Sequence, residues 1–444
     1  MEKFLFRHID NTPLIVFRII FGLLLFLESI GAIFTGWVTR TLVEPKFTFN
    51  FIGFEFLQPL PGNGMYFYYF IMGVFGFCVM IGYRYRLAII SFFVLWSATY
   101  LMQKSSYNNH YYLTALLSFI MIFQPANNYL SFDAKRKPEL KSISVPFWTS
   151  LLLMCQIGVV YFYGGIAKIY PDWLNAIPVK LFLSSKIDYP LIGSLFTKEW
   201  FHYFLSYSGI FFDILIIPLL LSRKTRFFGF ALSVFFHLFN AIIFQVGIFP
   251  FLTLSFAVFF FDAKIIRNIF LKRKPFYDEN EIIPPKRKNY YYLLIGTYLT
   301  IQLLLPLRHW LIKENVLWTE EGHRLSWRMM LRSKSGYQSF TVIDKTSQKA
   351  ESINLSDYLT HKQIGALSTK PDMIWQFAQR LKKEAAKNGH DIAVYVKGKV
   401  GVNGHDKQPL INDTIDIASL KWQYFKHSDW LLPYQKKTVN SKSK

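Results

Sequence analysis

Long apolar runs limit what this chain can fold into more than any other feature of its sequence. A helix needs roughly 17 to 25 mostly apolar residues to cross a bilayer. Six runs reach that length, at 14–34, 65–83, 87–103, 146–167, 201–221 and 290–311. Three more are shorter or carry polar residues, at 110–126, 227–244 and 247–262. The pattern predicts a polytopic α-helical membrane protein with about nine transmembrane helices.

The composition agrees with a membrane protein. Of 444 residues, 52% are hydrophobic and 19% are aromatic, which is too apolar for an ordinary soluble protein of this length. The first apolar run is long and lacks a small-residue cleavage site, so we expect it to remain as a signal anchor. Cys78 and Cys155 both lie inside apolar runs, which offers no disulfide framework, zinc site or CxxC redox pair.

The basic residues predict an orientation in the membrane. The net charge is +22, but Lys and Arg stand in short clusters and form no single stripe of the kind that binds nucleic acid. Every second loop is strongly basic, with clusters at 3–7, 84–86, 135–141, 223–226 and 264–288. The positive-inside rule therefore places the N-terminus in the cytoplasm and the C-terminus outside. No nucleic-acid partner is expected.

The composition changes after about residue 311. "QSFTVID" and "HDIAVYVKGKV" alternate between apolar and polar residues as strands do, and "DMIWQFAQRLKKEAAKNG" has an apolar face at helical spacing. We therefore expect a transmembrane domain at 1–311 and a small extracytoplasmic α+β domain at 312–434. The polar stretch 435–444 is expected to be a disordered tail.

Two polar clusters flank apolar runs on the predicted outer side. "SSYNNHYYL" contains Tyr107, Asn109 and His110, and "QIGVVYFYGGIAKIYPDW" contains Lys168. The first could be an ordinary interfacial belt of aromatic residues. Lys168 could be an anchor that extends its ammonium group to the lipid headgroups. Alternatively, a lysine buried away from water loses its proton more easily and becomes available as a base.

Two further clusters carry histidine. In "FFHLFNAIIFQVGIFPF", His237 and Asn240 share a helical face, where a structural hydrogen bond and a functional role are both open. "LWTEEGHRLSWRMM" either packs on headgroups or holds an anionic substrate through His323, Arg324 and Arg328. No metal site is expected, because His110 and His237 have no carboxylate or cysteine partner at ligand spacing and no HExxH occurs.

In their order along the chain, these four segments resemble the vitamin K-dependent γ-glutamyl carboxylases and the bacterial membrane proteins related to them through the HTTM domain. The resemblance is to an Asn-Asn-His segment, a "VYFxxGxxKxxxDW" segment, a Phe-His…Asn…Gly-x-Phe segment and a Trp-Thr…Ser-Trp-x-Met-Met segment. It covers nearly the whole chain. It implies a lyase that couples quinol epoxidation to carboxylation of glutamate with CO2.

The resemblance also implies roles for individual residues. Lys168 would be the catalytic base that activates reduced vitamin K, either phylloquinol or menaquinol, with O2 and CO2 as co-substrates and no metal. His110, also catalytic, and Asn109 would hydrogen-bond the quinone oxygens. The residues expected to bind the cofactor are Tyr107, Asn109, His110, His237 and Phe249. The residues expected to present the glutamate are Trp318, Thr319, His323 and Trp327.

Three positions depart from the family pattern. Ala167 stands where the animal enzymes have a second lysine, and Gly322 and His323 replace larger apolar or aromatic residues. A quinol-oxygenating enzyme with a different substrate therefore remains an alternative, as does a non-enzymatic membrane scaffold or carrier. The basic loops fit a bacterial inner-membrane homologue whose partners are membrane lipid, quinone and a glutamate-containing peptide or protein.

Overall fold

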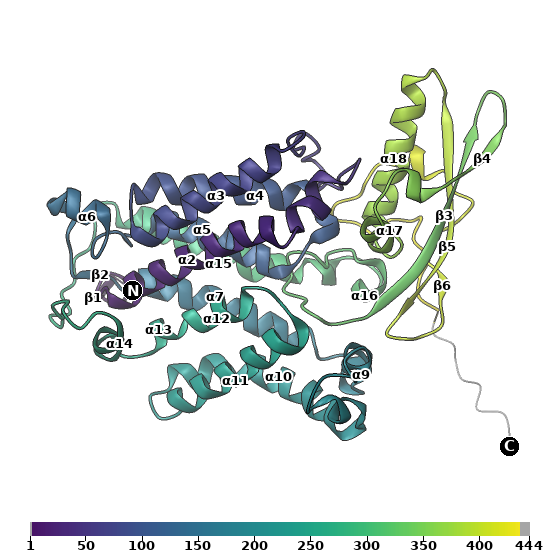
Figure 1. Cartoon of the computed structure of the whole chain (residues 1–444). Coiled ribbons are helices and arrows are strands. Elements are labelled where there is room, and N and C mark those ends of the chain that lie inside the picture. Colours follow the sequence, from purple (N-terminus) through teal and green to yellow (C-terminus); the bar gives the residue numbers. More distant parts are fainter. Residues whose placement is uncertain (1, 436–444) are drawn as a thin grey trace. The chain divides into compact units, whose positions relative to one another are not determined.

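The computed structural model describes residues 2–435 and separates into two compact units (Figure 1). The first unit comprises Met1–Glu44, Asn50–Ile166 and Ser208–Leu304. The second comprises Pro45–Phe49, Ala167–Tyr207 and Leu305–Lys444. The units are therefore interleaved along the chain, and the predicted boundaries 1–311 and 312–434 remain predictions. Apart from its first residue, the predicted tail 435–444 lies outside the described residues.

The described part of the chain contains seven helices long and apolar enough to cross a membrane. They are α2 (Thr12–Phe34), α3 (Gly64–Ile81), α4 (Tyr85–Met102), α7 (Trp148–Ile166), α10 (Glu199–Leu221), α11 (Arg226–Phe244) and Lys288–Leu311, which joins α15 (Lys288–Leu304) to a 3-10 turn. This confirms the mostly helical, membrane-type fold. Two apolar stretches are shorter: α5 (Asn109–Phe123), and α12 (Phe249–Ser255) followed by α13 (Ala257–Phe260). The count of nine is therefore not confirmed.

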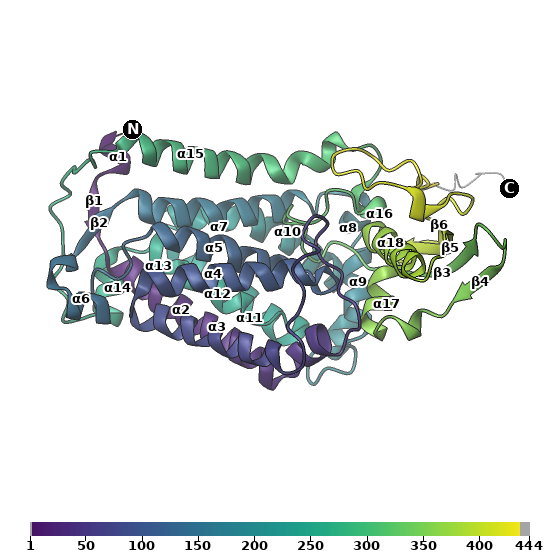
Figure 2. The same cartoon turned by 90° about the horizontal axis from the view of Figure 1, so that it is seen from above.

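Within the first unit the loops alternate between two ends of the helix bundle (Figures 1 and 2). One end, here called the basic end, holds residues 2–11, 82–84, 124–147, 222–225 and 261–287. These segments contain most of the basic clusters predicted to be cytoplasmic. The short elements of this end are α1 (Glu2–Leu5), β1 (His8–Asp10), α6 (Phe132–Arg136), β2 (Ser144–Pro146) and α14 (Ala263–Phe270).

A buried ion pair ties the basic end together. Lys274 Nζ lies 2.8 Å from Asp10 Oδ2, and both side chains are 1% exposed. Asp10 also accepts from the backbone N–H groups of Thr12 and Tyr277, so its carboxylate is fully hydrogen-bonded. Burial lowers the pKa of Lys274, and Asp10 opposes that shift. The N-terminus is thereby fixed to the segment that precedes α15.

Helices α2 and α3 pack closely through glycine. A Cβ atom added at Gly22 would overlap the backbone of Met80, and one added at Gly76 would lie 2.7 Å from the backbone nitrogen of Phe26. Small residues allow such close approach of transmembrane helices, which gain stability from packing and not from exclusion of water.

The second unit contains an antiparallel sheet of order β4-β3-β5-β6. Its strands are β3 (Lys334–Asp344), β4 (Ala350–Ile353), β5 (Ile392–Val402) and β6 (Gln408–Pro409). Helix α18 (Pro371–Lys387) contributes Phe377, whose ring meets Phe340 of β3 edge-on at 5.0 Å. The predicted strands and helix are thus confirmed. Gly389, two residues after the end of α18, has φ +81°, a conformation that glycine adopts readily at helix ends. The other helices of this unit are α8 (Pro171–Leu174), α9 (Ile177–Ser184), α16 (Val316–Thr319) and α17 (His361–Leu367).

Candidate functional site

In the first unit, the Asn-Asn-His segment forms the start of α5. Asn108 caps this helix, because its side-chain oxygen accepts from the backbone N–H of Tyr111 at 2.8 Å. Asn109 is buried, and its Oδ1 accepts from the Tyr107 hydroxyl at 3.0 Å. The first asparagine therefore has a local structural task, whereas the second is held by a tyrosine that the sequence also singled out.

His110 lies against Phe249 of α12. Their ring centroids are 4.2 Å apart at an interplanar angle of 66°. The His110 Nδ1 atom is buried and has no hydrogen-bond partner among the described residues. A buried nitrogen without a partner is costly, which is why such an atom is a candidate for contact with a bound ligand.

His237 has partners on both ring nitrogens. Its Nε2 is 2.7 Å from the Tyr161 hydroxyl of α7, and its Nδ1 is 3.3 Å from Thr253 Oγ1 of α12. The His237 and Phe249 ring centroids are 6.2 Å apart. The structure thus brings together His110, His237 and Phe249, all from the first unit.

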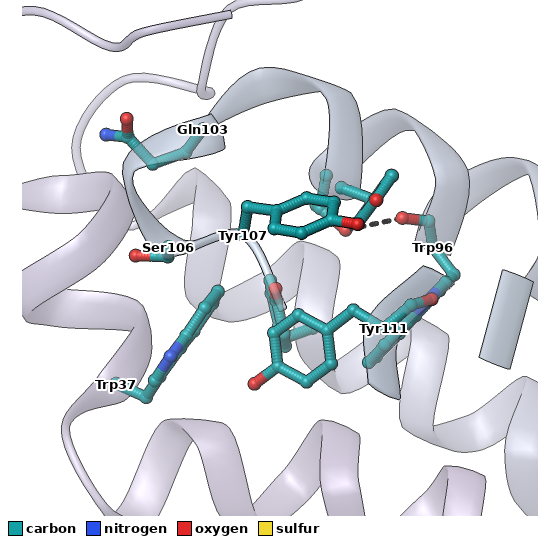
Figure 3. Close-up of a pocket in the computed structure, with 9 residues that line it drawn as sticks. Trp37, Trp96, Gln103, Ser106, Tyr107 and Tyr111 are labelled. Atoms are coloured by element: carbon teal, nitrogen blue, oxygen red, sulfur yellow. Dashed lines mark hydrogen bonds between the residues drawn. The ribbon is translucent and has the colours of Figure 1, made fainter. Parts of the chain in front are cut away.

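Tyr107 lines a separate aromatic cavity in the first unit. Figure 3 shows the rings of Trp37, Tyr107 and Tyr111 around a common pocket. The Trp96 and Tyr111 rings meet edge-on at 5.0 Å, and the Trp96 indole N–H donates to the Tyr111 carbonyl. The cavity is closed further by Tyr69, Thr99, Tyr100, Gln103 and Ser106.

Lys168 belongs to the second unit and follows two residues after the end of α7. Its side chain is buried, with Nζ 5.7 Å from the centroid of the Trp173 ring. Trp173 is itself fixed to α10, since its indole N–H donates to the Ser206 carbonyl at 3.1 Å and the Ser206 hydroxyl donates back to the Trp173 carbonyl. The ammonium group is therefore held over an aromatic face that cannot easily move.

The second unit also contains a cluster of charged side chains with an excess of cations, here called the charge cluster. Its five cations are Arg324, Arg328, Arg332, Lys334 and Lys370, and its two carboxylates are Glu320 and Asp372. An excess of three positive charges remains after the carboxylates are counted. Such an excess in a buried place favours binding of an anion.

Glu320 organises the charge cluster. Its carboxylate pairs with the Arg332 guanidinium, and Lys334 Nζ lies 3.2 Å from its Oε1. Burial alone would raise the pKa of Glu320, but the charges of Arg332 and Lys334 outweigh it and hold the pKa well below its usual range. Burial lowers the pKa of Lys334 to about 8. His323 joins the cluster through its Nε2, 2.9 Å from Arg332 Nη1.

Two family models cover most of the chain. The HTTM domain matches residues 6–264, and the vitamin K-dependent gamma-carboxylase, lumenal domain matches residues 287–437. The chain belongs to the vitamin K-dependent gamma-carboxylase family. No solved structure matches it. The family assignment made from the four polar segments is thus confirmed, and the protein is a gamma-carboxylase-like membrane protein.

The family name implies dependence on vitamin K, whose reduced form is a flat apolar ring with two oxygen atoms. Residues of this carboxylase-family chain fit such a group. Phe249 offers a ring face, and the buried Nδ1 of His110 beside it has no partner among residues 2–435. Within the same described range, no group of three His, Cys, Asp or Glu side chains could hold a metal ion.

Three predicted substrate residues of this family member are almost fully buried. Trp318 is 2% exposed and donates to the Leu432 carbonyl in the core of the α+β region, Thr319 is 1% exposed, and Trp327 is fully buried. Two residues of the predicted set contact the charge cluster: His323 lies against Arg332, and the Trp318 carbonyl accepts from Lys334 Nζ at 2.5 Å. Their roles in holding glutamate remain predictions.

Sequence reasoning missed several neighbours of the predicted residues. Tyr161 could have been found, because it lies in the same quoted segment as Lys168 and two helical turns before it. Thr253 lies four residues after Phe249 and so shares its helical face. Glu320 could also have been found, because it lies in the quoted segment "LWTEEGHRLSWRMM". Arg332, Lys334 and Lys370 had no comparable spacing to reveal them.

Proposed function

We propose that this protein is a membrane γ-glutamyl carboxylase that uses reduced vitamin K, with menaquinol as the natural quinol. The reaction would convert a peptide glutamate, CO2, O2 and the quinol into γ-carboxyglutamate, the quinone epoxide and water. The observation that carries the proposal is the buried Lys168, in a chain whose matches to the two family models extend over 6–264 and 287–437. The proposed location is a bacterial inner membrane, with the N-terminus cytoplasmic and the sheet region outside.

A glutamate γ-proton is too weakly acidic for any side chain to remove directly. When bound, reduced vitamin K supplies on oxidation by O2 a base that is strong enough. The protein's own residues would bind and orient the quinol and accept its proton. Lys168 would accept a proton at Nζ, which lies in a buried place beside the Trp173 ring. Asn109 and His110 Nδ1 would orient the quinol oxygens, and the rings of Phe249 and His237 would line its binding place.

The charge cluster would hold the glutamate substrate. Arginine forks bind carboxylates through paired hydrogen bonds, and the excess of cations suits a peptide that carries one carboxylate before the reaction and two after it. In the second unit, Tyr170 lies near Arg328 and Arg332, two residues after Lys168. The segment that carries the proposed base therefore lies beside the proposed substrate site.

A second candidate function has one observation in its favour. Trp318, Thr319 and Trp327, which the family resemblance assigns to glutamate, are at most 2% exposed, and Gly322 has φ +76° where the family has a larger residue. A quinol-oxygenating enzyme that acts on a different acidic substrate would retain Lys168 and the charge cluster without needing those side chains.

Incorporation of ¹⁴CO2 into a glutamate-containing peptide tests the proposal. Membranes that contain the protein should label the peptide only with reduced vitamin K or menaquinol and O2, and Lys168→Ala should abolish labelling. Lys180→Ala is the matched control, because Lys180 is an exposed lysine on α9 of the same unit. Epoxide that forms without label would favour the second candidate. If neither product forms with several quinols, the protein is better described as a membrane scaffold.

A further inference from the structure

The turn that follows Lys168 is held by three separate attachments within the second unit. The backbone N–H of Tyr170 donates to the Lys168 carbonyl at 3.0 Å, which couples the lysine backbone directly to the turn. Trp173 is fixed to α10, as described above. The side chains of Tyr170 and Asp172 instead reach residues at the ends of β3 and β5, more than 150 residues away in sequence.

Asn403 is the centre of these long-range attachments. It is buried just after β5 with φ +53°, a left-handed conformation that asparagine tolerates better than most residues. Its backbone N–H donates to the Ser333 carbonyl, and its Oδ1 accepts from the Ser333 N–H at 3.1 Å. Its Nδ2 donates to Asp172 Oδ2 at 2.8 Å and to the Tyr170 hydroxyl at 3.3 Å. Both polar atoms of this side chain are therefore used.

Two more contacts complete the arrangement, here called the clasp: Tyr170, Asp172, Asn403 and His405. His405 Nε2 lies 3.1 Å from the same Asp172 oxygen, and the Tyr170 hydroxyl donates to the Leu331 carbonyl. Burial raises the pKa of Tyr170 to about 12, so its hydroxyl remains a donor at neutral pH. Gly404, with φ +78°, completes the tight turn that brings Asn403 and His405 together.

A clasp of this kind is more than ordinary packing. A hydrogen bond to a carboxylate is roughly twice as strong as one between neutral groups. The clasp connects the turn to both central strands, β3 and β5, which pair over eleven residues from Lys334↔Val402 to Asp344↔Ile392. The backbone of Lys168 is thus connected through the clasp to the paired strands of the sheet.

We propose that Asp172 and Asn403 are positioning residues for Lys168, so that the sheet region sets where the proposed base stands. This inference rests on the proposed function of Lys168. Displacement of a reacting group by about 1 Å reduces rates by up to about 100-fold, and loss of residues that orient a catalytic group typically reduces them 10- to 100-fold. The clasp therefore makes the lumenal-type region part of the catalytic machinery and not only a platform for substrate.

Kinetics of quinone epoxide formation by the full-length protein in lipid nanodiscs test this. Asp172→Ala and Asn403→Ala should each lower kcat by about 10- to 100-fold while KM for the quinol and for the peptide stays unchanged. Asp172→Asn should retain much of the activity, because an amide oxygen still accepts from Asn403. Asn403→Asp should be as harmful as Asn403→Ala, since it replaces the donor by a second carboxylate.

The double variant D172N/N403D reverses the direction of the hydrogen bond and should recover activity toward that of D172N. Asp391→Ala is the matched control, because it removes an exposed carboxylate paired with Lys345 at the opposite end of the same strand pair. Thermal unfolding of each variant identifies any that fails to fold. If a single variant fails to fold, recovery of activity in the folded double variant becomes the deciding result.

The outcomes separate the inference from the proposed function. If Lys168→Ala abolishes epoxide formation while Asp172→Ala and Asn403→Ala keep wild-type kcat, the clasp does not position the base and the inference is overturned. A KM increase with unchanged kcat would also overturn it, because the clasp would then serve substrate binding. If Lys168→Ala is fully active, the proposed function itself fails.

Discussion

At the scale of single residues, Glu320 shows how a buried carboxylate can organise surplus positive charge. It lies between Arg332 and Lys334 and holds them in place, yet the cluster as a whole remains cationic. Removal of one partner of a buried ion pair typically costs 3 to 5 kcal/mol, roughly, because the remaining charges lose their compensation. Substitution of Glu320 is therefore expected to lower the free energy of unfolding, whether or not Glu320 takes part in the reaction.

The pKa of Glu320 predicts how stability depends on pH. Its pKa in the folded state is held below the ordinary value of 4.5, so the stabilisation is fully present above that value and is lost as pH falls below it. The Tm of the wild type in nanodiscs should therefore fall steadily as the pH is lowered below about 4.5. Glu320→Gln should be less stable at neutral pH and should show a flatter acid limb. An equally steep acid limb in Glu320→Gln would contradict this assignment.

At the scale of elements, close packing of α2 on α3 depends on the absence of side chains. Gly22→Ala should destabilise the protein by about 1 to 3 kcal/mol, because the new methyl group would overlap the Met80 backbone. Gly31→Ala is the matched control on the same helix, since a Cβ there meets nothing within 4 Å and alanine is the better helix former. Thermal unfolding should show a lower Tm for the first variant and an equal or higher Tm for the second. Equal losses in both would refute the packing argument.

The sequence predicted the elements better than it predicted their long-range contacts. Apolar runs and alternating segments identified helices and the two central strands, because those patterns are local. The pairing of Asn403 with Asp172 joins residues 231 positions apart, and no periodicity encodes such a contact. The same holds for Tyr161 and His237, which are 76 positions apart. Contacts of this long-range kind also join the segment 167–207 to the sheet region in one unit, which local sequence patterns could not predict.

At the scale of the whole molecule, the candidate residues fall into two groups. His110, His237 and Phe249 belong to the first unit, where they would receive an apolar cofactor, and Lys168 and the charge cluster belong to the second. In the first unit, the basic segment 124–147 follows the C-terminal end of α5, whereas Asn109 and His110 lie at the N-terminal end of that helix. This separation agrees with a site near the outer face of the membrane.

The predicted orientation can be tested with reporter fusions. A reporter active only outside the cytoplasm should be active when fused after residue 435 and inactive when fused at the N-terminus, because the basic loops are expected to stay inside. A second pair of fusions, in the loops 222–225 and 245–248, should report the inner and outer sides respectively. Outer-side activity from the 222–225 fusion would contradict the topology.

The proposed function requires that one protein couples oxygenation of a quinol to carboxylation of glutamate through Lys168. The most direct measurement is to quantify quinone epoxide and γ-carboxyglutamate together, in one reaction of purified protein with quinol, O2, CO2 and a glutamate peptide. We predict that both products form, that both disappear in Lys168→Ala, and that Lys180→Ala leaves both unchanged. Formation of both products by Lys168→Ala at the wild-type rate would overturn the proposed role of Lys168.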